Sequence, residues 1–487
     1  MKTLCGVLLL AGFAAVSYAG NAVVADAVEN RDLAALQALL AQHAAVNAAQ
    51  PDGTTALHWA AHWNDSETVG LLLKAGADAK AANHYGATPL SEAAALGNAT
   101  IIEQLLKAGA DPNTRTTADG ETVLMTSARA GNAEAVKVLL DHGADVNAKE
   151  GYRGQTALMW AAAERHADVA KLLLARGADW KIQSSFRETK IPKLSTASSI
   201  SPISRGGLTA FLFAAREGDI ETAKVMLDAG VDINQTDVDG TSGLVVSIMN
   251  KKYTFAKFLL DRGANPNVTD VKGRAALYAA IDMRNEDWSA LPMRKEADPL
   301  PSMDLIQAIL AHGANVNAQL THNLPGRSGM DYGDVALDQG ATPFMRAARS
   351  GDTATMQVLL KAGADPKIVT KDGNNALLFA AGIGYRDKQT QGTDAQALAA
   401  LQLCMKQGMD INQTNGKGET ALHGAAGRGS DVLVKFLVEH GAKLDVKSKA
   451  GFTPLDIAMG KDSFSLPVPH DTTVALLRTL GGAEGTR

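Results

Sequence analysis

The stretch HYGATPLSEAAALGNATIIEQLLKAGADPN, from His84 to Asn113, contains the pattern that decides the fold. A glycine turn is followed by a segment of small residues, a tight turn, an apolar segment and a second glycine. The same order recurs in DGTTALHWAAHWNDSETVGLLLKAGAD from Asp52 and in DGETVLMTSARAGNAEAVKVLLDHGADVN from Asp119. The turn glycines of four successive units, Gly53, Gly86, Gly120 and Gly154, lie 33, 34 and 34 residues apart. A fixed period of this length indicates stacked structural repeats.

The composition of each unit predicts two short helices. Small residues such as Ala60, Ala61, Ala93 and Ala94 allow the first helix to approach its neighbour closely. Segments such as GLLLKAG and VLLDHG supply a wider apolar stripe for the second helix, and the glycine that follows ends it. One such unit cannot bury its apolar face alone, because stacked neighbours supply the core. We therefore expect an elongated solenoid and not several globular domains.

The pattern resembles the ankyrin repeat, whose units read T-P-L-H-x-A-A, a tight turn, V-x-L-L-L and G-A-D. It recurs about eleven times, and DLAALQALLAQHAAVN from Asp32 resembles an N-terminal capping repeat. The resemblance implies an all-α ankyrin-repeat solenoid of about eleven to twelve helix-turn-helix repeats. A hairpin-like loop, the finger, joins each repeat to the next. The resemblance is to exported bacterial proteins of unassigned function.

The first residues predict export. Lys2 precedes a short apolar run from Leu4 to Val16, and small residues follow at Ser17 and Ala19, as at a signal-peptidase site. The run is too short for a membrane anchor. We expect a signal peptide over 1–19, a mature chain from near Gly20, and a periplasmic or secreted location. Cleavage removes Cys5 and leaves Cys404 as the one thiol, which its apolar helical position predicts to be buried and inert.

Five inserts interrupt the period. The predicted order is a capping repeat at 20–50, repeats at 51–183, 206–317 and 340–481, and a tail at 482–487. Inserts at 184–205 and 318–339 extend fingers, whereas those at 284–301, 385–396 and 461–471 lengthen the turn inside a repeat. Each insert is either a tolerated loop or a lid or docking arm. The repeat from Asp239 departs from the pattern, and with the split repeat after it predicts a softer joint near 240–300.

No catalytic signature is present in the sequence. It lacks a G-x-S-x-G elbow, a phosphate loop, H-E-x-x-H, a dinucleotide fingerprint and C-x-x-C-H. His58 and His62 share a helical face, but zinc needs three or four ligands and only His84 could join them. We therefore expect no enzymatic activity, no metal and no cofactor. The mildly acidic net charge of −5 does not favour nucleic acid, and the mature chain contains no membrane span.

The resemblance also implies where a partner binds. In ankyrin proteins the partner usually crosses a concave groove lined by finger residues and by the two residues after the Ala-Ala pair. Carried over position by position, this predicts the following groove residues: His62, Trp63, His84, Tyr85, Leu96, Asp119, Arg129, Arg153, Glu164, Arg216, Glu217 and Arg349. The aromatic members gather in the first two full repeats, and Trp, Tyr and Arg are the types that most often anchor interfaces. His58 and His423 occupy the histidine of T-P-L-H and are expected to be buried and structural.

These features together predict an exported, monomeric, non-enzymatic scaffold that binds another protein. Two alternatives remain open: an enzyme or small-molecule binder with its site under the inserts, and an exported effector or inhibitor module that uses the same groove.

Overall fold

The computed structural model describes residues 22–116, 119–188, 204–286, 298–324, 337–385, 390–461 and 469–485. These residues form twenty-four helices and two short strands, and the chain divides into two compact units between Asp179 and Trp180. Consecutive helices pair, so the described residues contain twelve helix pairs. The predicted all-α repeat solenoid is confirmed. The predicted signal peptide, residues 1–19, lies outside the described residues.

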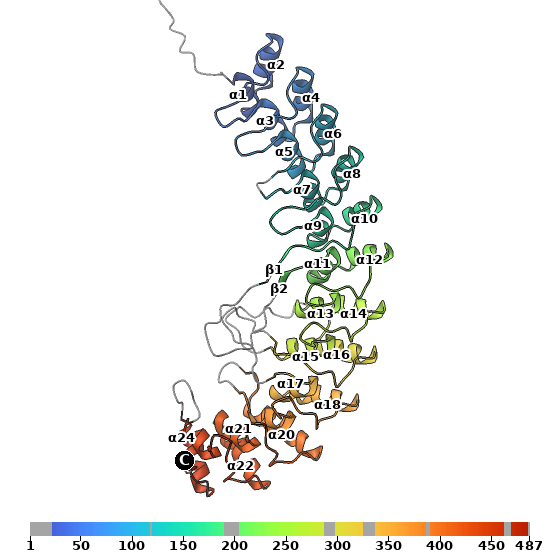
Figure 1. Ribbon diagram of the computed structural model, residues 1–487. Coiled ribbons are helices and arrows are strands. Elements are labelled where there is room, and N and C mark those ends of the chain that lie inside the picture. The colour runs from blue at the N-terminus through green and yellow to red at the C-terminus, as the bar shows by residue number, and fades with distance from the viewer. Residues whose placement is uncertain are drawn as a thin grey trace, which may run out of the picture. The chain divides into compact units, whose positions relative to one another are not determined.

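Unit 1 contains five helix pairs (Figure 1). They are α1 (Val23–Glu29), α2 (Leu33–Ala41), α3 (Ala56–His62), α4 (Ser66–Lys74), α5 (Pro89–Leu96), α6 (Ala99–Lys107), α7 (Val123–Ala130), α8 (Ala133–Asp141), α9 (Ala157–Ala163) and α10 (Ala167–Ala175). Each first helix packs on the first helix of the next pair, as α3 does on α5, and the second helices from α4 onward form a parallel row.

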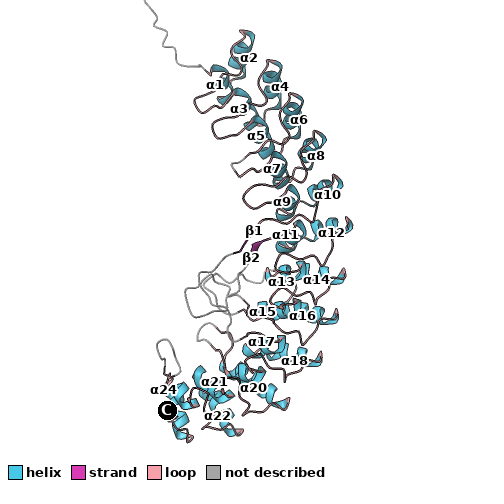
Figure 2. Cartoon of the chain, in the orientation of Figure 1, coloured by secondary structure: helices cyan, strands magenta, loops and turns pink. Residues whose placement is uncertain are grey.

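Unit 2 begins with a two-stranded antiparallel ribbon (Figure 2). Its elements are β1 (Phe186–Glu188), β2 (Ser204–Gly206), α11 (Ala210–Glu217), α12 (Ile220–Asp228), α13 (Gly243–Met249), α14 (Tyr253–Asp261), α15 (Ala276–Arg284), α16 (Ser302–Ala311), α17 (Pro343–Arg349), α18 (Thr353–Lys361), α19 (Ala376–Ala381), α20 (Asp394–Lys406), α21 (Ala421–Arg428), α22 (Asp431–Glu439), α23 (Pro454–Ala458) and α24 (Asp471–Thr479). The ribbon joins the two ends of the first finger insert.

The helix starts follow from capping residues. Thr88 accepts from the Ser91 amide to begin α5, and Asn98 accepts from the Ile101 amide to begin α6. Side-chain oxygens at these positions satisfy amides that have no partner within the helix. Gly97 adopts the left-handed conformation, φ 70°, in the tight turn between them, where a side chain would be strained.

Small residues let the first helices stack closely, and the second helices bury larger ones. Ala93 and Ala94 of α5 are fully buried, and so are Ile102 and Leu105 of α6. Neighbouring fingers are joined through their backbones, since the His84 amide donates to the Asp52 carbonyl at 2.8 Å. The core is therefore a continuous layer shared between repeats.

The repeat from Asp239 is regular despite its unusual sequence. Ser242 accepts from the Val245 amide and begins α13, and Tyr253 and Phe255 of α14 are almost fully buried. The division between the two units falls at 179 and 180, outside the predicted joint at 240–300. Earlier opening of that region in hydrogen exchange stays a prediction.

Candidate functional site

Three aromatic side chains form a cluster at the end of α3. Trp59, His62 and Trp63 are spaced i, i+3 and i+4, which places them on one side of the helix. The Trp59 and Trp63 rings stack with centroids 6.0 Å apart. His62 lies edge-on to both, with centroid distances of 5.8 Å to Trp59 and 5.0 Å to Trp63. We call these three residues the aromatic cluster.

Hydrogen bonds to two neighbouring repeats hold the aromatic cluster in place. Trp59 Nε1 donates to Gln50 Oε1 at 2.8 Å, and Gln50 Nε2 donates in turn to Glu29 Oε2 at 2.6 Å. On the other side, His62 Nδ1 lies 3.1 Å from Glu92 Oε2 of α5. Contacts on both sides fix the side chains before a partner arrives, which lowers the entropy cost of binding.

Trp59 was not among the predicted site residues. It precedes the Ala-Ala pair, whereas the prediction took from the first helix only the two residues after that pair. Its spacing of four residues from Trp63 is the sequence signal that could have identified it.

A small pocket adjoins the aromatic cluster, between the first two helix pairs. It has a volume of about 160 Å³ and is lined by residues that include Val28, Arg31, Leu36 and Trp63. The Arg31 guanidinium carbon lies 4.1 Å from the centroid of the Trp63 ring. Trp63 Nε1 is buried and has no hydrogen-bond partner in the part of the chain that the structure describes. The pocket therefore combines apolar side chains with the Arg31 guanidinium.

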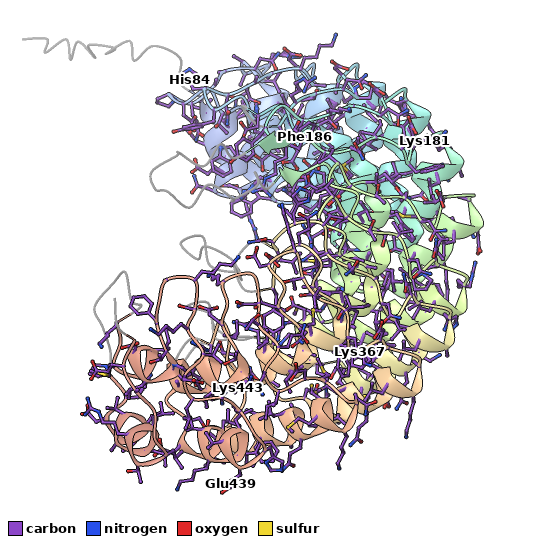
Figure 3. All side chains as sticks on the ribbon, turned by 60° about the horizontal axis from the view of Figure 1, so that its bottom comes forward. His84, Lys181, Phe186, Lys367, Glu439 and Lys443 are labelled. Atoms are coloured by element: carbon purple, nitrogen blue, oxygen red, sulfur yellow. The ribbon has the colours of Figure 1, made fainter. Side chains whose placement is uncertain are left out.

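The finger that follows α4 presents a further aromatic side chain. Tyr85 is 81% exposed, and its amide donates to Asn83 Oδ1 at 3.0 Å. His84, labelled in Figure 3, is exposed on the same finger. Large exposed apolar residues in unit 1 also include Leu96 at the end of α5 and Tyr152 on a later finger.

The predicted residues further along unit 1 form local pairs. Arg129 lies 3.3 Å from Glu121 and also packs over Trp160, at 5.2 Å from the ring centroid. Arg153 lies over Tyr152 at 5.5 Å. Glu164 is exposed, as is Asp119, whose carbonyl accepts from the Gly151 amide. These residues line successive first helices and fingers of unit 1.

In unit 2 the predicted groove residues are less exposed to solvent. Arg216 is half-buried, pairs with Glu217 at 2.8 Å and packs over Phe213. Arg349 corrects the prediction of an exposed groove residue, since it is only 5% exposed. Its guanidinium donates to Gly384 O and to Thr390 Oγ1, each at 3.3 Å, because the lengthened turn of the next repeat lies over it.

His58 and His423 are both 2% exposed and link successive repeats. His58 Nδ1 lies 3.2 Å from the Thr55 amide nitrogen, which can only donate, so Nδ1 accepts there. Its Nε2 lies 3.0 Å from Ala87 O on the next finger and must carry the proton. His423 makes the equivalent contacts to Thr420 and Phe452. Burial lowers the pKa of His58, which favours this neutral form.

Partly buried ion pairs lie at the start of the insert at 284–301. Arg346 pairs with Asp282 at 2.7 Å and Arg284 pairs with Asp352 at 2.8 Å, both across neighbouring repeats. Gln391 donates to the Glu286 carbonyl and so joins two inserts. Most of the inserts lies outside the described residues, namely 189–203, 287–297, 325–336, 386–389 and 462–468.

The described residues provide little for catalysis. Within them, no group of three or more His, Cys, Asp or Glu side chains is placed to hold a metal ion. Cys404 is fully buried, and burial raises the pKa of its thiol to about 12, so the nucleophilic thiolate does not form near neutral pH. No helix among the described residues combines the length and apolar character needed to span a bilayer.

Known proteins share this repeat. The chain is 32% identical over 118 residues to ankyrin repeat and SOCS box protein 16 of Mus musculus, covering 24% of this chain and 25% of that protein. It is 26% identical over 253 residues to the ankyrin repeat protein YahD of Escherichia coli (strain K12), covering 51% and 87%. The phosphocholine transferase AnkX of Legionella pneumophila is 29% identical over 133 residues, or 27% of this chain and 13% of that protein.

The chain also matches one solved structure in part and two family models. The human ASB11 ankyrin repeat domain matches with a TM-score of 0.41 and 23% identity, over 50% of this chain and 98% of that chain. The model for three copies of the ankyrin repeat matches residues 24–116, 113–184, 205–298 and 393–468, and the model for a single ankyrin repeat matches 339–371. The two family models together cover more than half of the chain, which therefore belongs to the ankyrin repeat family.

Proposed function

We propose that this protein is an exported, monomeric, non-enzymatic scaffold that binds a protein partner through the aromatic cluster and the Tyr85 finger. The ankyrin repeat is typically a binding scaffold, which supports the general function. The observation that carries the choice of surface is the 81% exposure of Tyr85 in unit 1, where the Trp59–Trp63 stack is also held. Truncation of such an aromatic anchor typically costs about 2 kcal/mol of binding free energy or more.

The contacts of each residue decide which variant tests the surface. Trp63 is half-buried and contacts both Arg31 and Trp59, so Trp63→Ala would lower stability as well as binding. Tyr85 is exposed, so Tyr85→Ala should leave the thermal unfolding temperature nearly unchanged. His62 is also exposed and its contact with Glu92 lies at the surface, so His62→Ala should lower that temperature only slightly. We expect the double variant to lose partner capture by about tenfold or more, which corresponds to about 1.4 kcal/mol.

Val432→Ala is the matched control. Val432 is 48% exposed on α22, a second helix, away from the fingers. Proteins from the native exported fraction that bind wild type and Val432→Ala but not the double variant are specific for the proposed surface. If capture by the double variant equals that by wild type, the aromatic cluster and Tyr85 are not the interface.

The signal-like residues support export as part of this proposal. The test is the N-terminal residue of the protein recovered from the periplasm or medium of a bacterial host that expresses the full chain. We expect it to begin near Gly20. Recovery in the cytosol with Lys2 still present would contradict export and would leave the binding surface to be judged separately.

A further inference from the structure

Residues 483–485 pack against the start of α23 through three kinds of contact. Thr453 Oγ1 donates to Ala483 O at 2.9 Å, and the Gly485 amide donates to Asp456 Oδ2 at 2.7 Å. Glu484 pairs with Lys461 at 2.7 Å and with Arg478 at 3.4 Å. The segment is thus recognised through its backbone and through one acidic side chain.

In the repeats that contain His58 and His423, the corresponding place is taken by the finger of the following repeat. The third residue of α3, His58, contacts Ala87 O of the next finger at 3.0 Å, and His423 contacts Phe452 O in the same way at 3.1 Å. Asp456 is the third residue of α23. Because a carboxylate accepts where the histidine donates, Asp456 holds a backbone amide in place of a carbonyl.

The contact also selects glycine. A Cβ atom on Gly485 would overlap Gly451 O and would lie only 2.9 Å from Asp456 Oδ2. Both neighbours are held, Gly451 in the turn of its finger and Asp456 by Lys461 Nζ at 2.7 Å. No larger residue fits at this position without moving backbone.

We propose that Thr453, Asp456, Lys461 and Arg478 form a binding site for a peptide with the pattern x-Glu-Gly, in which residue x contributes only its carbonyl oxygen, and that residues 483–485 occupy it within the same chain. The two cations select the glutamate, and the close approach of Gly451 O selects the glycine. An attached segment competes at an effective concentration of about millimolar, so a peptide from another molecule binds only when the segment is displaced.

Protonation does not release the segment near neutral pH. Burial tends to raise the pKa of Asp456, but the ammonium of Lys461 and the amides of Thr453 and Gly485 lower it to about 2. The carboxylate therefore stays charged, and competition by another peptide is the means of opening the site.

The test uses a chain that ends after Gly482 and the labelled peptide acetyl-Gly-Gly-Ala-Glu-Gly-Thr-Arg. Fluorescence anisotropy should show saturable binding to the shortened chain and at least tenfold weaker binding to the full chain. A second peptide, with alanine in place of the glycine that follows glutamate, should bind at least tenfold more weakly. If the shortened chain keeps its helical circular dichroism but binds neither peptide at millimolar concentration, or binds both equally, the proposal is wrong.

Two full-length variants test the proposal if shortening the chain unfolds the last repeat. Gly485→Ala should expel the segment and allow the labelled peptide to bind at least tenfold more tightly than to wild type. Ala483→Ser is the matched control, because Ala483 is exposed and contributes its carbonyl oxygen. Equal peptide binding by wild type, Gly485→Ala and Ala483→Ser would overturn the proposal.

Discussion

Replacement of His58 by methionine tests how neighbouring repeats are joined. His58 is 2% exposed and makes one contact to the next repeat, 3.0 Å from Nε2 to Ala87 O. Methionine already occupies the equivalent positions Met125 and Met159, both buried, so the change keeps the packing volume close to that of a natural repeat. The change removes two hydrogen bonds of His58, from Nε2 to Ala87 O and from the Thr55 amide to Nδ1. A methionine sulfur can take the place of Nδ1, since Met125 Sδ lies 3.5 Å from the Thr122 amide nitrogen in the equivalent position. Loss of the Nε2 bond costs about 1 kcal/mol, and leaving the Ala87 carbonyl without that donor costs about 1 kcal/mol more.

We therefore expect His58→Met to lower the free energy of unfolding by about 2 kcal/mol. Urea denaturation at pH 7.5 measures the loss in the free energy of unfolding of the whole chain. Hydrogen exchange of the finger amides at 83–87 measures the free energy of local opening, which does not depend on two-state unfolding. A loss below about 0.5 kcal/mol, the lower end for one hydrogen bond, would refute the assigned role of the Nε2 contact.

The same variant tests the protonation of His58. Burial lowers the pKa of His58 below its ordinary value of 6.5, so the unfolded chain binds more protons than the folded chain in this pH window. The stability contributed by the neutral ring is present above pH 6.5 and is lost as the pH falls through the folded pKa. Wild type should lose more stability than His58→Met between pH 7.5 and pH 5. Equal losses in the two proteins would contradict this assignment.

Two further predictions concern unit 2. Cys404, buried and with a raised thiol pKa of about 12, should not react with a thiol reagent at pH 8 until denaturant is added; rapid reaction of the native protein would contradict its burial. Arg346→Met removes a largely buried ion pair with Asp282, at 2.7 Å, together with the hydrogen bond from the guanidinium to Ser350 Oγ, and should cost about 3–5 kcal/mol of stability. A midpoint in urea equal to that of wild type would show that water replaces the ion pair.

Much of the fold could be predicted because it depends on residues close together in the sequence. The period of 33 to 34 residues, the capping side chains and the glycine turns specify each helix pair locally. The burial of Cys404 follows from the same periodicity. These features need no knowledge of which residues meet across repeats.

The candidate site was predicted only in part, because its contacts join different repeats. His62, Trp63 and Tyr85 follow from their positions in the repeat, but the role of Trp59 depends on Gln50 of the preceding finger. Arg349 occupies a position that is exposed in some other repeats, as at His62 and Arg129. It is buried because the lengthened turn that contains Gly384 and Thr390 lies over it.

The sequence by itself determined the helix pairs, their stacking and the finger positions, because local periodicity specifies which residues are apolar, capped or turned. Only the tertiary structure decided which polar groups meet between repeats. The pairing of Arg31 with Trp63 and the seating of residues 483–485 on α23 depend on distances between segments that no local pattern encodes. Side chains at equivalent repeat positions therefore differ in exposure and role according to the neighbours that the stack provides.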